Sequence, residues 1–295
     1  MIQVRGLTRR FGDATVVDDV TFDVPRGKLT GFVGGNGAGK TTTMRMIMGL
    51  LGLHGGEVLW EGRPITASDR RRFGYMPEER GLYPKQKILD QLVYLGELSG
   101  LNAGVARASA QEYLERFGLA DRGADRVEKL SLGNQQRVQI IAALMSSPVA
   151  LVLDEPFSGL DPRAVDSMVD LLREETARST PVLFSSHQLD LVEQLCDHLV
   201  VLAGGRVVAQ GTVEELRARG PERLRLVTDR DAGWVRDVRG LSVVDVDGAV
   251  ALLELNDHGD GVRRALLTEG LARGEVRELS RVTTPLAEIY REVTA

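Results

Sequence analysis

The stretch LTGFVGGNGAGKTTTMRMIM, residues 29–48, places a glycine-dense turn between a short apolar run and a helical continuation. The apolar run Leu29–Val33 predicts a strand, and we expect a helix to begin at Lys40. Residues Gly34 to Thr41 carry the spacing G-x-x-x-x-G-K-T, which is the P-loop pattern. Glycine suits such a turn because a Cβ atom would prevent backbone N–H groups from curling around a phosphate.

Three features of this turn favour a polyphosphate ligand. The helix N-terminus adds roughly half a positive charge beside the glycines. The Lys40 ammonium supplies a full charge for β- and γ-phosphates, and the Thr41 hydroxyl suits Mg²⁺. The alternative is an ordinary glycine-rich turn, which the preceding strand, the following helix and the fixed positions together disfavour. We therefore predict that the chain binds a nucleoside triphosphate.

The composition narrows the class of protein. The 295 residues are 43% hydrophobic and only 5% aromatic, so the chain can bury a sizeable aliphatic core. A net charge of −5 disfavours a nucleic-acid partner held by a basic stripe. Cys196 is the single cysteine, which excludes an internal disulfide and fits a reducing compartment.

The sequence contains no segment that predicts membrane insertion. The N-terminus MIQVRGLTRRF lacks the apolar region of a signal peptide. The best candidate for a membrane span, residues 140–153, is interrupted by two serines and Pro148, and falls short of the roughly 18 apolar residues required. We expect a chain that is soluble by itself, so any membrane role depends on a partner.

Further apolar runs predict an α/β sheet. VALVLDEP (149–156) and PVLFSSH (181–187) read as strands buried on both faces of a parallel sheet. The segment between them reads as an amphipathic helix with Pro162 in its first turn. Strands that alternate with helices indicate a doubly wound sheet, whose ligands bind at the carboxyl ends of the strands. The P-loop, Asp154 and His187 would meet there.

The remaining segments suggest the domain organisation. Residues 2–24 read as strands around a turn, and residues 88–130 read as an all-helical insertion. Beyond Gly220-Pro221 the pattern is strand, helix (AGWVRDV), strand, strand, helix, strand and a last helix, which suggests a small ferredoxin-like domain. We expect one domain over residues 1–219 and a smaller one over residues 221–295.

An acidic pair ends the strand VALVLDEP. Asp154 can hold the Mg²⁺ shell, and Glu155 can polarise a water for attack on the γ-phosphorus. Such a pair is usually part of a turn, but the P-loop earlier in the chain favours catalysis. His187, at the end of the next strand, is placed to hydrogen-bond the γ-phosphate. Phe11 is a candidate platform for adenine stacking, and Val16 would line the same pocket.

In this order, these residues resemble the ATP-binding cassette (ABC) family, and the resemblance covers roughly residues 1–219. The family signature LSGGQ appears as LSLGN at 130–134, the D-loop SGLD spans Ser158–Asp161, and His187 stands at the switch histidine. The resemblance implies an α/β P-loop NTPase cassette. It would have an antiparallel β subdomain and a helical subdomain at about 88–145, followed by the small α+β accessory domain.

The resemblance further implies a head-to-tail dimer of cassettes that binds two ATP molecules with Mg²⁺. Each ATP would lie between one copy's P-loop and the other copy's signature. There the Ser131 side chain and the Gly133 backbone would face the γ-phosphate at a helix N-terminus.

The resemblance assigns roles to individual residues. Lys40, Glu155 and His187 would be catalytic. The metal would be held by Thr41, Asp154 and Glu78. The expected ATP contacts are Phe11, Val16, Gly34, Gly35, Asn36, Gly37, Ala38, Gly39, Lys40, Thr41 and Thr42. The partner's ATP would meet Ser131, Leu132, Gly133 and Asn134, with Asp161 in the D-loop.

Some positions depart from the family pattern. Leu132 replaces the glycine and Asn134 the glutamine of the signature, and Glu78 occupies the position where the family usually carries glutamine. The segments EERGLYP and LSLGNQQ and the motif PLAEIY at 285–290 resemble the sodium- and drug-exporter branch, whose ATPase pairs with a separately encoded membrane subunit.

We therefore expect an ATPase that drives a separate integral membrane permease from the cytoplasmic face of the cell membrane. One alternative is a soluble cassette ATPase that acts on ribosomes or DNA. A single cassette, a short insertion and an acidic charge balance disfavour it. Another alternative is an ATPase switch regulated by a ligand of the tail domain, and a tail that only buttresses the dimer fits the sequence equally well.

Overall fold

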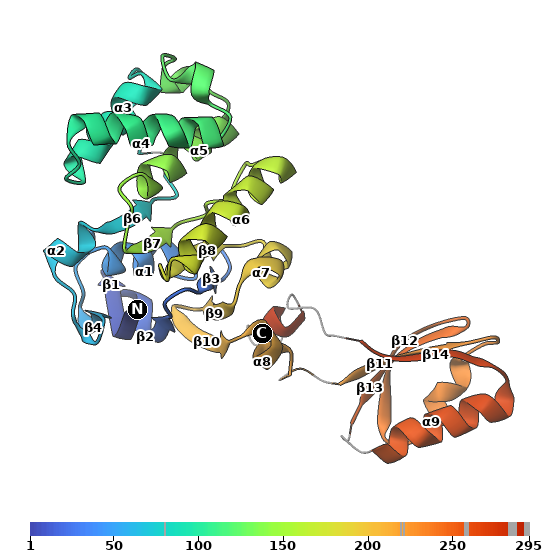
Figure 1. The fold of residues 1–295 in the computed structure, drawn as a ribbon. Coiled ribbons are helices and arrows are strands. Elements are labelled where there is room, and N and C mark those ends of the chain that lie inside the picture. Colours follow the sequence, from blue (N-terminus) through green and yellow to red (C-terminus); the bar gives the residue numbers. More distant parts are fainter. Residues whose placement is uncertain (80, 219, 221, 257–259, 283–287, 292–295) are drawn as a thin grey trace. The chain divides into compact units, whose positions relative to one another are not determined.

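The computed structural model describes residues 1–79, 81–218, 220, 222–256, 260–282 and 288–291 (Figure 1). The chain forms two compact units, Met1–Thr212 and Val213–Ala295. The second unit thus begins a few residues before the domain boundary predicted at residues 219–221. That boundary stays a prediction.

The first unit contains an antiparallel sheet with the strand order β2-β1-β4-β5. The predicted strands around a turn at residues 2–24 are β1 (Ile2–Phe11) and β2 (Ala14–Val24), which pair antiparallel. On the other edge of β1 lie β4 (Gly55–Trp60) and the short β5 (Arg63–Pro64).

A six-stranded sheet with the order β10-β9-β3-β8-β7-β6 carries the P-loop. Its strands from β9 to β6 run parallel, and only β10 is antiparallel to its neighbour. The predicted buried strands are fully buried, since most of their residues are apolar on both faces. The strands are β10 (Arg206–Gly211), β9 (His198–Ala203), β3 (Leu29–Val33), β8 (Val182–Ser186), β7 (Ala150–Leu153) and β6 (Phe73–Met76).

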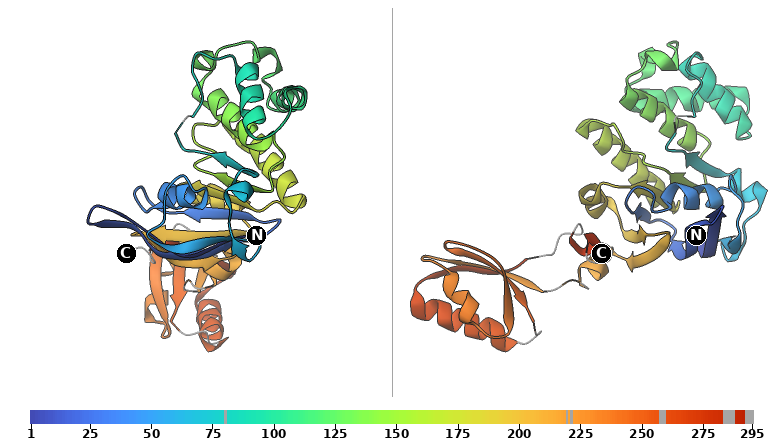
Figure 2. Two further views of the ribbon diagram at one scale, coloured as in Figure 1. Left: turned by 90° about the vertical axis from the view of Figure 1, so that its left-hand side faces the viewer. Right: turned by 180° about the vertical axis from the view of Figure 1, so that it is seen from behind.

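Helices complete the layers of this unit (Figures 1 and 2). Helix α1 (Lys40–Ile47) buries Met44, Met46 and Ile47 in one core cluster with side chains of both sheets. Helices α6 (Pro162–Ala177) and α7 (Leu189–Leu195) contact β3, and α6 also contacts β8. This arrangement confirms the doubly wound sheet.

The predicted helical insertion contains α3 (Ile88–Leu98), α4 (Ala103–Arg116) and two 3₁₀ turns, η1 (Ala120–Arg122) and η2 (Val127–Lys129). Helix α5 (Leu132–Leu144) follows and contacts α3, α4 and strand β6, so it connects the insertion to the sheet. A one-turn helix, α2 (Ala67–Arg70), precedes β6.

The second unit begins with α8 (Val213–Arg217) and then forms an antiparallel sheet with the order β12-β13-β11-β14. This is the order of a ferredoxin-like sheet, as the sequence suggested. The strands are β11 (Arg223–Thr228), β12 (Leu241–Asp247), β13 (Val250–Leu255) and β14 (Val276–Val282), and the helix is α9 (Asp260–Arg273).

The first helix expected in this unit is shorter than the sequence suggested. The helix expected at AGWVRDV is a 3₁₀ turn, η3 (Gly233–Asp237), so the α-helix prediction was wrong there. The segment is short, and the Asp231 carboxylate accepts the Gly233 N–H at 3.1 Å, which favours a local turn. Of the PLAEIY motif at residues 285–290, the first three residues lie outside the described residues, and the last three are helical.

Glycine permits a close approach between α5 and β6. A Cβ atom on Gly74 of β6 would lie 2.2 Å from the Ala143 carbonyl oxygen and 2.6 Å from Leu151 Cδ2. The helix can therefore reach the sheet only where no side chain intervenes.

We expect Gly74→Ala to lower the free energy of unfolding by about 1–3 kcal/mol, because an extra methyl overpacks the core. Urea unfolding followed by circular dichroism measures this change. The control is Gly104→Ala in α4, where the added Cβ meets only Asn102 Oδ1 at 3.5 Å. This control should stabilise the chain by about 0.5–1 kcal/mol. An unchanged midpoint for Gly74→Ala would contradict the close packing.

Candidate functional site

The register of the parallel strands gathers the predicted site residues at one sheet edge. Val33 of β3 pairs with Ser186 of β8, and Met76 of β6 pairs with Leu153 of β7. The P-loop, His187, Glu78 and the pair Asp154-Glu155 follow these strand ends directly. The edge where the carboxyl ends meet is the usual ligand position of such sheets.

The P-loop connects β3 to α1 in a conformation that needs glycine. Gly39 has φ 102°, and a Cβ there would lie 2.8 Å from the Val16 carbonyl oxygen. A Cβ on Gly34 would lie 2.5 Å from the Leu202 carbonyl oxygen. Side chains other than hydrogen would therefore clash with neighbouring backbone at these positions.

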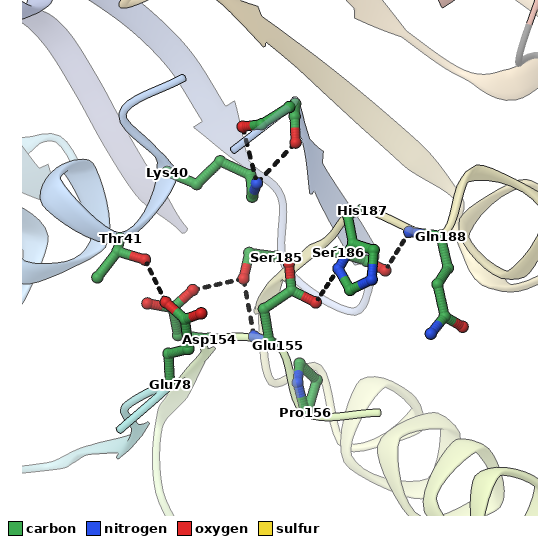
Figure 3. Close-up of polar contacts among 12 residues, drawn as sticks. Lys40, Thr41, Glu78, Asp154, Glu155, Pro156, Ser185, Ser186, His187 and Gln188 are labelled. Carbon is green, nitrogen blue, oxygen red and sulfur yellow. Dashed lines mark hydrogen bonds and ion pairs between the residues drawn. The ribbon is translucent and has the colours of Figure 1, made fainter. Parts of the chain in front are cut away.

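Lys40 is held by its own loop. The Lys40 ammonium donates to the carbonyl oxygens of Gly34 at 2.6 Å and Gly35 at 3.3 Å, and the residue is only 8% exposed (Figure 3). An ammonium has three donors, so one further bond to a phosphate oxygen is compatible with this position. The P-loop thus presents a fixed cation rather than a mobile side chain.

A hollow of about 240 Å³ lies over the P-loop. It is lined by Val16, Gly35, Asn36, Gly37, Ala38, Gly39, Lys40, Thr41, Thr42, Glu78 and Glu155. Nearly all the expected ATP contacts therefore surround one cavity, with Gly34 just behind it as an acceptor for Lys40.

Phe11 is not among the residues that line the hollow. Its ring is 48% exposed at the end of β1, and the Arg9 guanidinium lies 4.9 Å from the ring centroid. A cation over the ring face is itself a favourable contact. The role of Phe11 in adenine stacking stays a prediction.

The residues expected at the metal supply suitable oxygens. Thr41 Oγ1 donates to Glu78 Oε2 at 3.2 Å, and Asp154 is completely buried beside them (Figure 3). Asp154 Oδ2 is buried without a hydrogen-bond partner among the described residues. Burial raises the pKa of Asp154, the nearby Glu78 carboxylate adds to this rise, and the bond from Ser185 opposes it. An orphaned carboxylate oxygen, a hydroxyl and a second carboxylate fit Mg²⁺, which prefers oxygen ligands.

Glu155 and His187 form a pair at the mouth of the site. His187 Nδ1 lies 3.0 Å from Glu155 Oε2, and the side chains are 54% and 12% exposed. Glu155 has φ 52°, a left-handed conformation that is uncommon for a residue with a side chain. His187 was expected at the γ-phosphate, and here it contacts the carboxylate expected to activate water.

Ser185 links the acidic pair and was missed by the sequence reasoning. Its hydroxyl donates to Asp154 Oδ1 at 2.6 Å and accepts the Glu155 N–H at 2.8 Å (Figure 3). One buried oxygen thus fixes the side chain of Asp154 and the backbone of Glu155. A serine within a buried apolar strand was the only sequence signal for this role.

The signature residues do not line this hollow. Ser131 is the N-cap of α5, where its hydroxyl accepts the Asn134 N–H at 3.4 Å, and Leu132 is 58% exposed. Asp161 caps α6 by accepting the Ala164 N–H at 2.9 Å. These residues therefore lie outside the hollow formed by their own P-loop.

Comparison with known proteins assigns this architecture to a family. Residues 17–158 match the family described as "ABC transporter", and residues 211–294 match "ATP-binding protein DrrA1-3-like, C-terminal domain". The "Uncharacterized ABC transporter ATP-binding protein YhaQ" of Bacillus subtilis (strain 168) is 39% identical over 92% of this chain and 88% of that protein. This chain belongs to the ABC transporter ATP-binding proteins.

Other relatives support this family assignment. The "Daunorubicin resistance ATP-binding protein DrrA3" of Streptomyces coeruleorubidus is 35% identical over 99% of this chain and 95% of that protein. A solved structure, "Structure of ATP binding subunit of ABC transporter", is 32% identical with a TM-score of 0.69, and covers 74% of this chain and 92% of its own. This ABC protein is an ATPase by family, since its members couple ATP hydrolysis to transport.

We expect Ser185→Ala to lower kcat/KM for ATP about tenfold, which corresponds to roughly 1.4 kcal/mol. Because the Ser185 bond lowers the pKa of Asp154, its loss should raise that pKa. Less of Asp154 would then be ionised in mild acid, so the acid limb of the pH–rate profile should move to higher pH.

The control for this variant is Ser109→Ala, which removes a hydroxyl bonded to the Met145 carbonyl oxygen in the helical region. Steady-state ATPase assays across pH compare the two. A Ser185→Ala profile that falls uniformly, without a shift of its acid limb, would contradict the link to Asp154.

Proposed function

We propose that this ABC ATPase is the motor subunit of an exporter and hydrolyses Mg-ATP in a head-to-tail dimer to drive a separate membrane permease. One observation carries the proposal. Lys40 and Glu155 line one hollow and Asp154 is buried next to Glu155, whereas the signature at Ser131 caps a helix outside this hollow. A second copy would complete the site.

Residues in and beside the hollow would have separate roles in ATP hydrolysis. Lys40 and the N-terminus of α1 hold the β- and γ-phosphates. Thr41, Asp154 and Glu78 would hold Mg²⁺, which when bound neutralises phosphate charge. Glu155 accepts a proton from the attacking water, and His187 orients its carboxylate through the 3.0 Å contact.

The partner copy would close the site with a helix terminus. Ser131 and the first N–H groups of α5 form an exposed N-terminus, which attracts a γ-phosphate. Leu132 and Asn134 leave this backbone feature intact, because the amides rather than the side chains bind the anion. Hydrolysis and phosphate release would then reopen the dimer.

The names of relatives support export as the direction of transport. DrrA3 is a daunorubicin resistance protein, LnrL of Bacillus subtilis (strain 168), 33% identical, is a linearmycin resistance protein, and a Burkholderia lata relative, 36% identical, is a Nod factor export protein. We place this chain in the same functional class, as a cytoplasmic protein bound to the inner face of the membrane. None of the helices in the described part of the chain is long and apolar enough to cross a membrane.

A groove offers a place for that permease. A hollow of about 380 Å³ is bounded by β6, the loop after it and the helices α3 and α5. Apolar side chains such as Phe73, Leu82 and Leu95 line it together with Arg70 and Arg71. Leu98, 64% exposed, lies at the same groove. Pro77 and Gly81 also line the groove, so a partner seated there would contact the loop that carries Glu78.

We expect Glu155→Gln to retain ATP binding but to lower kcat by about 100-fold or more, because a general base is lost. The variant should accumulate as an ATP-dependent dimer in analytical ultracentrifugation. Lys40→Ala serves as the contrasting variant, since it should lose ATP affinity instead. A Glu155→Gln protein that stays monomeric with full turnover would refute the proposal.

We expect Leu98→Glu to lose co-purification with a multi-span membrane protein encoded beside this chain, because a buried charge would be left without a partner. The measurement is affinity purification after co-expression and detergent extraction. Leu271→Glu in α9 is the matched control, since Leu271 is also 64% exposed. Equal loss in both variants, or in neither, would contradict the assignment of the groove.

A further inference from the structure

Helix α5 makes contacts that its signature end does not explain. Gln136 and Gln139 lie one turn apart on this helix and are only 7% and 4% exposed. Each donates its side-chain Nε2 group to two main-chain carbonyl oxygens of a loop that carries a catalytic carboxylate. Buried amides in such positions fix the backbone that they bind.

Gln136 holds the loop of the proposed general base. Its Nε2 donates to the carbonyl oxygens of Glu155 at 3.0 Å and Pro156 at 3.2 Å. The N–H of Glu155 is bound to Ser185 Oγ at 2.8 Å. Both polar backbone groups of Glu155 are therefore engaged. Because φ 52° is an unfavourable conformation for a residue with a side chain, several contacts with the surrounding structure are needed to maintain it.

Gln139 holds the loop of Glu78 in the same manner. Its Nε2 lies 3.3 Å from the carbonyl oxygens of Pro77 and Glu79, which flank Glu78. The Glu78 side chain accepts the Thr41 hydroxyl at 3.2 Å. The amide thus spans the residue that would complete the metal site.

The two amides connect these loops to the signature through a single helix. Ser131 caps the N-terminus of α5, and Gln136 and Gln139 follow within the next two turns. Arg137, between them, contacts Asp161 at 3.4 Å. Because a hydrogen-bonded helix resists bending, a displacement at its N-terminus moves the amides with it.

We propose that Gln136 and Gln139 are positioning residues that fix the Glu155 and Glu78 loops to the signature helix. The inference rests on the proposed function, in which the signature binds the partner's ATP. Closure on that ATP then sets the catalytic carboxylates of the copy that contributes the signature. The two amides are the points at which one site acts on the other.

The test uses Gln136→Met and Gln139→Met in the full chain, since methionine keeps the volume and removes the donors. We expect kcat to fall at least about tenfold in each variant, because small misplacements of catalytic groups are costly. KM for ATP should stay within about twofold, because the Lys40 loop is untouched. A kcat like that of the unmodified chain would overturn the inference.

Gln91→Met provides the matched control. Gln91 is completely buried and its amide exchanges two hydrogen bonds of 3.0 Å with the Tyr83 backbone, away from the catalytic hollow. The Gln91→Met variant should lower Tm by about as much as the test variants do, but it should retain the kcat of the unmodified chain. If Gln91→Met loses as much kcat as Gln136→Met, the amides are only structural and the inference fails.

A double-mutant cycle separates positioning from general damage. If Gln136 acts through Glu155, adding Gln136→Met to Glu155→Gln should not lower the residual turnover further. Multiplicative losses would overturn the inference. An unmodified chain without any ATP turnover would instead contradict the proposed function, so the two failures are distinguishable.

Discussion

The parallel register of four strands is the constraint on which the rest of this protein depends. Because β3, β8, β7 and β6 run in one direction and are in register, their carboxyl ends form a single edge. Every loop that leaves this edge carries a charged or phosphate-binding group. The close fit of α5 on Gly74 and of α1 between the two sheets preserves this register. Packing far from the site therefore has direct consequences for its geometry.

The site carries more negative than positive charge. Lys40 and the N-terminus of α1 face the carboxylates Glu78, Asp154 and Glu155. Burial raises the pKa of Asp154, so its ionised form is costly until a cation neutralises it. A polyphosphate alone would add to the repulsion. In the proposed Mg-ATP complex, the divalent cation would relieve this repulsion.

Helix α5 serves two sites at once. In the proposed dimer its N-terminal end presents Ser131 to a second copy, and its buried face binds the loops of Glu155 and Glu78 through Gln136 and Gln139. The same helix lines the groove proposed for the permease. A movement of α5 would therefore couple partner, nucleotide and catalytic loops. The second unit has its own core under an antiparallel sheet.

The sequence by itself determined the strands, most of the helices and the P-loop, because these depend on local periodicity and on glycine positions. It also identified Asp154, Glu155 and His187 as neighbours, since parallel strands end at one edge. Only the tertiary structure decided that Ser185 joins the acidic pair, and that Gln136 and Gln139 bind the loops of Glu155 and Glu78. These bonds depend on which strands lie adjacent and on how a helix docks against them. The spacing of residues along the chain does not reveal such non-local contacts. The P-loop, in contrast, is a local pattern of eight residues that can be recognised in the sequence itself.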